Sequence, residues 1–370
     1  MAEPALRLLA GPDALNEINR DGLSFARVRT VAGASGGPKW LVLAGLDHYF
    51  AAEVVPRLAG EVSLLGSSIG AWRNVSLAQT NPSAAVQRFE RAYIEQRYTV
   101  KPTPAEVTAM SYQILSELLG DDGVRAALEH PVLRQSIVTV RCRRATASDR
   151  RLPLAAGLLA AASANFVRRD WLGRFFTRAV FHDPRSQPVW LQQADIETTA
   201  IALNEANLVD AVVASGSIPF VLSGVRDPAG APSGVYRDGG VIDYHLDLPL
   251  SADDGIALFP HFYSTITPGW FDKRLTGRHG NPAHFRRVLL LAPSAAFVDT
   301  LPGRKIPDRT DFTTMSDDER IAAWRTVVSA SRRLADEFAE LVEHERLGAA
   351  VEPLNLRRTQ RSRRRQAHAG

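Results

Sequence analysis

EVSLLGSSIG, residues 61–70, joins an apolar strand pattern to a tight glycine turn, and the apolar stretch AWRNVSLA that follows predicts a helix. The same order of elements occurs earlier in the chain. Residues 25–32, FARVRTVA, predict a strand, the glycine-rich residues 33–39 predict a turn, and WLVLAGLDHYF, residues 40–50, predicts a buried helix. Strands that alternate with helices in this way favour a parallel sheet covered by helices. We therefore expect an α/β fold with a mainly parallel central sheet.

Other stretches extend this pattern. Residues 103–119 predict a helix, because Thr103 suits the N-cap, Pro104 suits the first helical position and Glu106 completes a capping box. Strands are expected at 135–144, 198–203 and 288–293, and an amphipathic helix at 317–347. The chain has no internal repeat and no clear linker, so we expect a single domain over residues 1–350.

The composition is that of a water-soluble globular protein, because hydrophobic residues make up 45% and charged residues 23% of the 370 residues. No apolar run reaches the roughly 18 residues that a membrane-spanning helix needs. The N-terminus does not resemble a secretory signal. The single cysteine, Cys142, rules out an internal disulfide and fits a reducing compartment. We therefore expect a cytoplasmic protein, with peripheral attachment to a membrane as an alternative.

The net charge of +4 comes from the C-terminus rather than from the body of the chain. Residues 357–365, RRTQRSRRR, contain six arginines and no acidic residue, which leaves 38 basic and 40 acidic residues elsewhere. A surface of the fold that binds nucleic acid is therefore not expected. We expect residues 351–370 to form a basic, disordered tail. The alternative is contact with an anionic membrane, where each arginine contributes about 1 kcal/mol.

The glycine turn at residues 66–70 matches the pattern G-x-S-x-G, with Gly66, Ser68 and Gly70 at the fixed positions. A serine between a strand and a helix is held in strained backbone angles, which expose its hydroxyl group above the sheet. The flanking glycines leave room for the turn and for a substrate. Ordinary turns also match the pattern, but the apolar strand and helix around it are the setting that a nucleophilic serine requires. We therefore predict that Ser68 is a nucleophile.

The glycine-rich residues 33–39 do not match the two common nucleotide-binding patterns. A P-loop needs a glycine before its lysine and a hydroxyl residue after it, whereas Pro38 and Trp40 occupy these positions. The dinucleotide pattern G-x-G-x-x-G fails because Ser35 stands where its second glycine should be. We therefore expect no cofactor at this loop.

The same loop has the features of an oxyanion hole, in which backbone N–H groups stabilise a developing negative charge. Gly36 and Gly37 have no side chains, so their amides can approach a tetrahedral centre closely. Pro38 has no N–H group to donate, and Lys39 would add positive charge nearby. The alternative interpretation is a plain turn between a strand and a helix.

Asp238 is the candidate base. Gly239 and Gly240 follow it, and a carboxylate before two glycines is also common in simple turns, because aspartate accepts hydrogen bonds from the amides that follow. The presence of the glycine loop and the serine turn earlier in the chain favours a functional role.

These segments together resemble the patatin-like phospholipase family. GGPK at 36–39, GSSIG at 66–70 and DGG at 238–240 are similar to the oxyanion loop, nucleophile turn and acid motif of that family, and they occur in the family's order. A fourth segment, ASGSIPF at 214–220, resembles the family's stretch between a helix and a strand shortly before the acid. The resemblance covers about residues 25–250 and implies a three-layer α/β/α fold with a mainly parallel sheet.

The resemblance also implies a serine acyl hydrolase that cleaves acyl esters of phospholipids or related lipids. Ser68 would attack the acyl carbonyl group, and Asp238 would accept the hydroxyl proton without help from a histidine. Gly36, Gly37 and Lys39 would stabilise the oxyanion, and water activated by Asp238 would release the acyl-enzyme. Neither a metal nor a cofactor is implied. A carboxylate with a reference pKa of about 3.9 is a weak base, but burial raises its pKa.

The chain departs from the family pattern at three places. Ser35 replaces the first of three consecutive glycines, Trp40 stands where a small residue is common, and the chain continues as VIDYHLDLP, residues 241–249, where the family often shows asparagine and proline after the acid. These differences affect substrate preference more than catalysis. Two alternatives stay open: a lipid-binding or scaffold protein without activity on the same fold, and a non-lipid esterase or thioesterase.

Two other kinds of catalytic site have less support. A Ser–Asp–His triad needs a histidine after the acid, and the four eligible histidines lie in no recognisable motif: His245, His261, His279 and His284. The chain has no HExxH motif and no paired Cys/His spacing, which argues against a catalytic metal. Cys142 lies in a strand pattern and is expected to be inert.

Residues 152–181 form an unusual stretch. The first half is apolar and rich in small residues, and the second half interleaves aromatic residues with arginines. These are Phe166, Trp171, Phe175, Phe176 and Phe181 with Arg168, Arg169, Arg174 and Arg178. The stretch is too short and too basic to span a bilayer. It suits either a core helix followed by an amphipathic surface helix, or an interfacial segment over the Ser68 cleft that contacts lipid headgroups.

Overall fold

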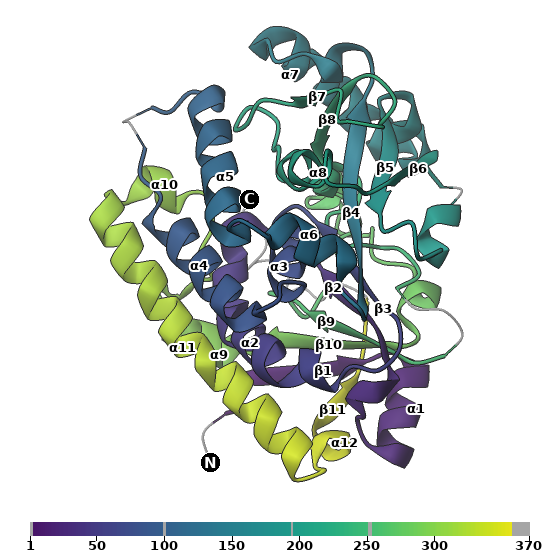
Figure 1. Cartoon of the computed structure of the whole chain (residues 1–370), viewed down its shortest axis with the longest axis vertical. Helices are drawn as coiled ribbons and strands as arrows, with labels where there is room; N and C mark the ends of the chain where they lie inside the picture. The colour runs from purple at the N-terminus through teal and green to yellow at the C-terminus, as the bar shows by residue number, and fades with distance from the viewer. Residues whose placement is uncertain (1–2, 99–100, 194, 251–253, 357–370) are drawn as a thin grey trace.

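Eleven strands of the described residues form one mixed sheet at the centre of the molecule (Figure 1). The structure is a computed structural model that describes residues 3–98, 101–193, 195–250 and 254–356. The strands are β1 (Leu6–Ala10), β2 (Val28–Gly33), β3 (Val62–Ser67), β4 (Leu133–Cys142), β5 (Phe176–His182), β6 (Thr198–Ala202), β7 (Val225–Arg226), β8 (Val235–Asp238), β9 (Ile256–Pro260), β10 (Val288–Pro293) and β11 (Val351–Pro353).

The middle of the sheet is parallel. Its strand order is β11-β1-β10-β9-β2-β3-β4-β5-β6, and β8 joins β4 and carries β7. Strands β10, β9, β2, β3 and β4 all run in the same direction. Antiparallel pairs occur only outside this run among the described strands, between β1 and β10, β4 and β5, β4 and β8, and β7 and β8. The predicted α/β fold with a mainly parallel sheet is therefore confirmed.

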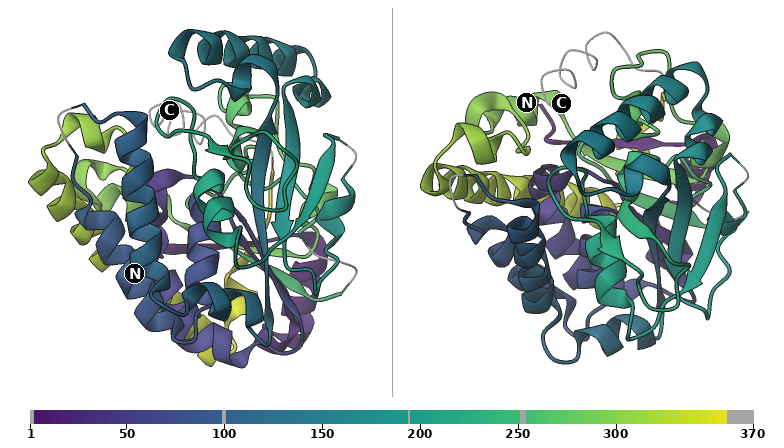
Figure 2. Two further views of the ribbon diagram at one scale, coloured as in Figure 1. Left: turned by 45° about the horizontal axis from the view of Figure 1, so that its top comes forward. Right: turned by 90° about the horizontal axis from the view of Figure 1, so that it is seen from above.

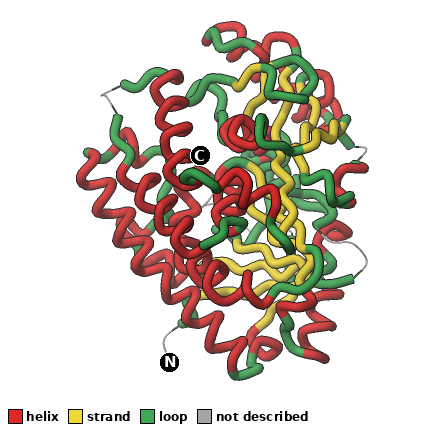
Figure 3. Tube along the Cα trace, in the orientation of Figure 1, coloured by secondary structure: helices red, strands yellow, loops and turns green. Residues whose placement is uncertain are grey.

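Helices cover both sides of the sheet (Figure 3). They are α1 (Pro12–Asp21), α2 (Ala44–Tyr49), α3 (Ile69–Leu77), α4 (Pro82–Glu95), α5 (Pro104–Leu119), α6 (Gly123–Glu129), α7 (Arg151–Val167), α8 (Leu208–Ser215), α9 (Ala295–Thr300), α10 (Asp311–Thr314), α11 (Asp317–Glu343) and α12 (Leu347–Ala350). Helices α2, α3, α4, α5 and α11 pack on one another as one layer, whereas α1 packs against β1 and β10. Figure 2 shows the layer of α4, α5 and α11 on one side of the strands.

Local sequence signals set the ends of the longest helices. Thr103 and Glu106 form the predicted capping box at the start of α5, because each side chain accepts a hydrogen bond from the backbone N–H of the other. Ser316 and Glu319 form the same motif at the start of α11. The predicted amphipathic helix is therefore present, although it ends at Glu343, earlier than expected.

The predicted strands at 61–67, 135–144, 198–203 and 288–293 are found as β3, β4, β6 and β10, and their ends differ from the prediction by at most two residues. The strand expected at 25–32 begins only at β2, after a 3-10 turn.

The buried helical stretch predicted over residues 40–50 is present, but it is not one regular α-helix. A 3-10 helix, α2 and a π-helical turn divide this region as Gly37–Leu43, Ala44–Tyr49 and Phe50–Val54. The 3-10 segment lies in the core, where Trp40 stacks on Phe89 of α4 with ring centroids 4.7 Å apart. Tertiary packing therefore outweighs the local preference for an α-helix.

The second half of the 152–181 stretch is not one surface helix, which corrects that expectation. Phe166 lies at the end of α7, Arg169–Arg174 form a 3-10 turn, and the buried strand β5 begins at Phe176. Phe176 and Phe181 of β5 are fully buried. Arg178 is also buried, and its guanidinium group binds the carboxylate of Asp243 at 2.7 Å. Helix α7 and the turn that follows it remain as a candidate surface. None of the described helices is long and apolar enough to cross a membrane.

The folded domain extends beyond residue 350. Strand β11 pairs in parallel with β1, and Arg7 of β1 forms an ion pair with Glu352 at 2.7 Å. The expectation that residues 351–370 form a disordered tail is therefore wrong at its beginning. The arginine run at 357–365 lies outside the described residues.

Strand β4 brings two distant segments together. Ser67, the last residue of β3, pairs with Val138, and Asp238, the last residue of β8, pairs with Thr139. Because Val138 and Thr139 are consecutive, the ends of β3 and β8 meet along one edge of β4. Ser68 directly follows β3, so the sheet register sets it beside Asp238.

Candidate active site

Ser68 lies at the turn between β3 and α3. Its backbone angles, φ 55° and ψ −131°, are rare for a residue other than glycine, and such a conformation costs on the order of 1–3 kcal/mol. Close packing of glycines permits the turn. A Cβ atom on Gly70 would lie 1.9 Å from the carbonyl oxygen of Gly33, and one on Gly66 would lie 2.5 Å from the Cα of Ala71. These glycines therefore allow the strained serine to be held in one position.

Asp238 is hydrogen-bonded directly to Ser68. The Ser68 hydroxyl donates to Oδ2 at 2.7 Å, and the N–H of Gly240 donates to Oδ1 at 2.7 Å. Burial raises the pKa of Asp238 to about 6, and these two hydrogen bonds oppose the rise. Gly239 leaves space for this arrangement, because a Cβ atom there would lie 2.3 Å from the carbonyl oxygen of Val138. A carboxylate with this pKa is a better proton acceptor than an ordinary aspartate.

Two buried serines of the ASGSIPF segment fix the backbone of this pair. Ser215 Oγ accepts a hydrogen bond from the N–H of Ser68 at 2.8 Å and donates one to the carbonyl oxygen of Val138 at 2.7 Å. The carbonyl oxygen of Ser217 accepts a hydrogen bond from the N–H of Asp238 at 3.2 Å. The resemblance of this segment to the patatin-like family predicts no role for these two serines. Two hydroxyl residues within an apolar stretch are the signal that points to them.

The glycine loop lines the same pocket as the Ser–Asp pair. Two hydrogen bonds hold its first half, from Ser35 Oγ to Ser67 Oγ at 2.9 Å and from the N–H of Ser35 to the carbonyl oxygen of Tyr244 at 3.0 Å. Within the described part of the chain, no protein acceptor takes the N–H of Gly36 or Gly37. Both amides therefore remain as donors for a bound negative oxygen.

Steric constraints explain both glycines of this loop. A Cβ atom on Gly36 would lie 2.5 Å from a ring carbon of Phe262. Gly37 has φ +53°, which is unfavourable for residues with a side chain. Pro38 follows at the start of the 3-10 helix and contributes no donor. The loop is thus shaped for backbone contacts.

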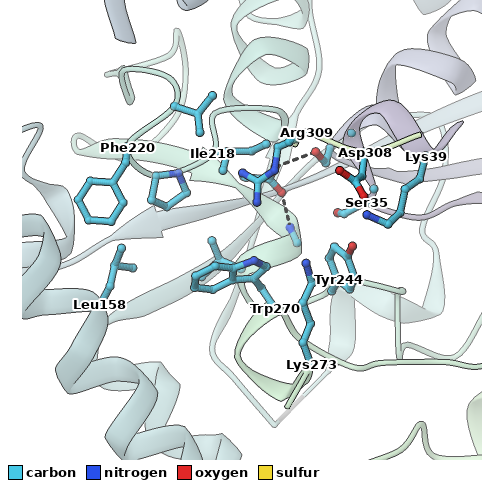
Figure 4. A pocket seen from close by; sticks show the side chains of 18 of the residues that line it. Ser35, Lys39, Leu158, Ile218, Phe220, Tyr244, Trp270, Lys273, Asp308 and Arg309 are labelled. Carbon is cyan, nitrogen blue, oxygen red and sulfur yellow. Dashed lines mark hydrogen bonds between the residues drawn. The ribbon is translucent and has the colours of Figure 1, made fainter. Parts of the chain in front are cut away.

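A pocket of about 330 Å³ opens in front of Ser68 and Asp238 (Figure 4). Its side chains divide into two groups. Apolar side chains come from Leu158, Ile218, Pro219, Phe220, Val221, Val241 and Trp270. Polar and charged side chains come from Lys39, Tyr244, Lys273, Asp308, Arg309 and Thr310. Figure 4 shows the labelled apolar side chains mainly on the left and the labelled charged ones on the right.

The charged side contains two lysines with altered basicity. Burial lowers the pKa of Lys39 to about 8 and that of Lys273 to about 7. The Lys273 ammonium group lies over the ring of Tyr244, 4.4 Å from its centroid. Asp308 accepts a hydrogen bond from the N–H of Thr310 at 2.8 Å. At neutral pH this side of the pocket carries both signs of charge.

Three of these charged residues were not foreseen. Lys273, Asp308 and Arg309 lie in loops after the acid motif and belong to no recognisable sequence pattern. Of the predicted site residues, the structure brings Ser68, Asp238 and the glycine loop with Lys39 into one pocket.

None of the four eligible histidines lines this pocket. The rings of His245 and His261 are buried with centroids 4.3 Å apart, and burial lowers the pKa of His261 to about 3. His284 is paired with Asp247 at 2.9 Å. A histidine-based triad around Ser68 is therefore not supported.

Neither a metal site nor a reactive cysteine is found in the described ranges. These residues contain no group of three or more His, Cys, Asp or Glu side chains that could hold a metal ion. Burial raises the pKa of the Cys142 thiol to about 12, so the thiol is protonated at neutral pH.

Sequence comparisons find no family model and no curated protein that matches the chain. The fold is similar to that of VipD. The crystal structure of VipD from Legionella pneumophila aligns with 70% of this chain and 53% of its own, at 11% sequence identity and a TM-score of 0.30. This chain thus spans about half the length of VipD. The likeness is remote and assigns no role to the pocket residues.

Proposed function

We propose that this protein is a serine acyl hydrolase that cleaves lipid acyl esters, with Ser68 as the nucleophile and Asp238 as the base. The observation that carries the proposal is the 2.7 Å hydrogen bond from the Ser68 hydroxyl to the buried Asp238 carboxylate. A nucleophile within hydrogen-bond reach of its base is the arrangement that covalent acyl transfer requires. The resemblance of four sequence motifs to patatin-like phospholipases supports the same activity.

The first half of the reaction acylates Ser68. Its Oγ attacks the carbonyl carbon of the ester while its proton moves to Asp238, and the carbonyl oxygen becomes an oxyanion. The N–H groups of Gly36 and Gly37 stabilise this charge, because the N–H of Ser68 is already donated to Ser215. When the tetrahedral intermediate collapses, the bond to the leaving alcohol breaks and the alcohol takes the proton from Asp238.

The second half of the reaction releases the acyl group. A water molecule attacks the acyl-enzyme carbonyl, and Asp238 accepts the proton that the water loses. The new oxyanion again binds the amides of the glycine loop, and Lys39 provides positive charge on that side of the pocket. Collapse of the intermediate returns the proton to the Ser68 oxygen and frees a carboxylic acid.

The two-sided pocket suits an amphiphilic ester. The acyl chain would lie against the apolar side chains of Leu158, Phe220 and Trp270, where its burial is favourable. The more polar part of the substrate would face Lys273 and Arg309. A lipid has this division between an apolar chain and a polar head. A small polar ester has no chain that could fill the apolar side of the pocket.

Reaction with a fluorophosphonate probe tests the proposal, because such probes modify activated serines. We expect the wild-type protein to be labelled, and peptide mass spectrometry to locate the label on Ser68 rather than on its neighbour Ser67. Asp238→Asn should react far more slowly. A folded wild-type protein that does not react would instead be a lipid-binding protein without activity.

A substrate panel tests the lipid part of the proposal separately. Long-chain lipid esters should be hydrolysed with a higher kcat/KM than short-chain esters and thioesters of similar reactivity, because only a long chain fills the apolar side of the pocket. A preference for short esters or thioesters would assign the protein to the non-lipid esterases or thioesterases.

A further inference from the structure

Exposed apolar side chains are concentrated near the mouth of the pocket. Seven large apolar residues of the described chain are more than about a third exposed: Leu152, Leu159, Phe166, Val167, Val189, Phe220 and Trp270. Four of the seven belong to α7, and two others, Phe220 and Trp270, line the pocket itself. Val189 lies outside both groups. Single exposed apolar residues are ordinary, but a patch of this kind marks a surface that binds another hydrophobic surface.

The outward face of α7 is apolar along its whole length. Leu152, Leu159 and Phe166 are seven residues apart, so they lie on one face of the helix, and they are 83%, 70% and 72% exposed. The other exposed positions between them hold one proline, three alanines and one serine, and no charged residue occurs between Arg151 and Arg168. A surface helix normally has a polar outward face. The outward face of α7 therefore lacks its partner among the described residues.

The inward face of α7 is firmly attached to the active-site side of the molecule. A Cβ atom on Gly157 would lie 2.8 Å from the backbone nitrogen of Thr146, so the helix packs closely on the turn before it. Asn165 donates a hydrogen bond to the carboxylate of Asp272 at 2.7 Å. The patch is thus carried on a fixed helix.

The C-terminal end of α7 is tied to the segment that follows Asp238. Arg169 donates a hydrogen bond to the carbonyl oxygen of Ile242 at 2.7 Å and forms an ion pair with Asp272 at 3.2 Å. Asp272 directly precedes Lys273 of the pocket. The orientation of α7 relative to the Ser–Asp pair is therefore set by buried hydrogen bonds.

Helix α7 borders the apolar side of the pocket through its inward face. Leu158 is on α7 and lines the pocket together with Phe220 and Trp270, and Figure 4 shows the three side chains around the same apolar region. Helix α7 lies at one end of the molecule in Figure 1. A flat hydrophobic surface that covered α7 would consequently face the entrance of the apolar half of the pocket.

Arginines at both ends of α7 indicate the charge of the partner. Arg150 and Arg151 are exposed at its N-terminal end, where the helix dipole disfavours positive charge, so they do not serve to stabilise the helix. Arg168 and Arg174 are exposed beyond its C-terminal end, and Arg168 is paired there with Asp170 at 2.6 Å. Arg174 lies over the ring of Trp171, 4.6 Å from its centroid. An apolar face flanked by cations and an aromatic ring fits the boundary between acyl chains and anionic headgroups.

We propose that the outward face of α7, together with Phe220 and Trp270, is the surface by which this protein docks on an anionic lipid bilayer. The apolar side chains enter the acyl boundary, and the arginines at both helix ends contact the headgroups. Docking by this surface does not depend on catalysis. Transfer of acyl chains from the bilayer into the pocket would be a further consequence, and it rests on the proposed function. Of the residues 152–181, this surface uses α7 and the turn after it, whereas residues 176–181 are buried in strand β5.

Sedimentation with vesicles tests the docking surface. The parent protein is the full chain with Ser68→Ala, so that no lipid is hydrolysed during binding, and the vesicles are phosphatidylcholine with or without phosphatidylserine. The test variant adds Leu152→Ser, Leu159→Ser and Phe166→Ser, which are exposed positions. The matched control adds Val189→Ser, which removes an exposed apolar side chain elsewhere.

We expect the parent and the control to bind vesicles that contain phosphatidylserine, and the triple variant to bind them at least about tenfold more weakly. Removing phosphatidylserine should also weaken vesicle binding by the parent, because Arg150, Arg151 and Arg174 then face no anionic headgroups. Vesicle binding by the triple variant that equals the parent would overturn the proposal. So would a parent that ignores vesicles but forms a dimer which the triple variant abolishes, since that result assigns the face to a second copy of the chain.

Activity measurements separate this proposal from the proposed function. In the protein that retains Ser68, the triple substitution should lower the ratio of the hydrolysis rate on vesicles to the hydrolysis rate of a soluble short-chain ester. Thermal unfolding checks that the variant is folded. A protein that binds vesicles through α7 but does not react with fluorophosphonate would retain the docking surface and lose the hydrolase assignment.

Discussion

The hydroxyl of Ser68 donates a 2.7 Å hydrogen bond to the carboxylate of Asp238 although 170 positions separate them in the chain. Strand β4 causes this proximity, because its consecutive residues Val138 and Thr139 pair with the ends of β3 and β8. Backbone hydrogen bonds of one sheet therefore fix the nucleophile and the base. Small changes in either residue should therefore have a large effect on the activity.

Replacement of either member of the pair should abolish ester hydrolysis. Ser68→Ala removes the attacking oxygen, and Asp238→Asn removes the proton acceptor while keeping the size of the side chain. We expect kcat/KM for a soluble ester to fall by at least about a thousandfold in both variants, with circular dichroism spectra like the wild type. Ser111→Ala, which removes a hydroxyl group from α5 outside the pocket, is the control. Full activity in either pair variant would reject the dyad.

The activity should depend on pH through Asp238. The carboxylate must be ionised to accept the Ser68 proton, and burial raises its pKa to about 6. We therefore expect kcat/KM for a soluble, uncharged ester to increase as the pH rises through about 6. A pH profile that measures the acid limb checks this expectation. An acid limb near pH 4, the usual range for an exposed aspartate, would contradict it.

Ionisation of the same carboxyl group should lower the stability of the folded protein, although it increases the activity. Its pKa in the folded protein is raised from 3.8 to about 6, so the folded state holds the proton more tightly than the unfolded state does. The resulting stabilisation is fully present below about pH 4 and is lost as the pH rises through about 6, a change of about 3 kcal/mol. The amide side chain of Asp238→Asn does not titrate in this pH range. We expect this variant to gain stability relative to the wild type between pH 4 and pH 7 in urea unfolding, and a constant difference would contradict the pKa shift.

Gly239 should tolerate no side chain. In Gly239→Ala the new Cβ atom would lie 2.3 Å from the carbonyl oxygen of Val138 and 2.8 Å from Ser67 Oγ, so β8 must move away from β4 and carry Asp238 with it. We expect a loss of about 1–3 kcal/mol in the free energy of unfolding and a large loss of activity. Gly173→Ala is the matched control, because nothing lies within 4 Å of a Cβ atom there. Equal stability of the two variants would show that β8 can move away from β4 at little cost in free energy.

The residues of the pair and of the glycine loop can be predicted from the sequence because each depends on a local backbone requirement. Ser68 needs a strained turn between two glycines, and Gly36 and Gly37 need the absence of a Cβ atom. Such requirements leave a pattern within a few residues. The alternation of strands and helices likewise predicts a mainly parallel sheet, since each element has its own periodicity.

Other features depend on distant parts of the chain and leave no local pattern. Lys273 and Arg309 reach the pocket only because long loops return to it. The stretch 166–181 suggests a surface segment because arginines occur among its aromatic residues, yet its last part forms the buried strand β5. Arg178 is buried there because Asp243, which is distant in sequence, neutralises it at 2.7 Å. A buried ion pair thus gives a core strand the appearance of a surface segment.

Lys273 should determine a preference for anionic substrates. It lines the charged side of the pocket with Arg309, and a hydrogen bond to a charged group contributes about 1.5–3 kcal/mol. The ratio of kcat/KM for an anionic ester to that for its neutral analogue should therefore fall by about tenfold in Lys273→Gln. Lys273→Arg keeps the charge and should keep most of the preference. Because burial lowers the pKa of Lys273 to about 7, the wild-type preference should weaken as the pH rises above 7, and that of Lys273→Arg should not. An unchanged ratio in Lys273→Gln would mean that the head of the substrate binds elsewhere.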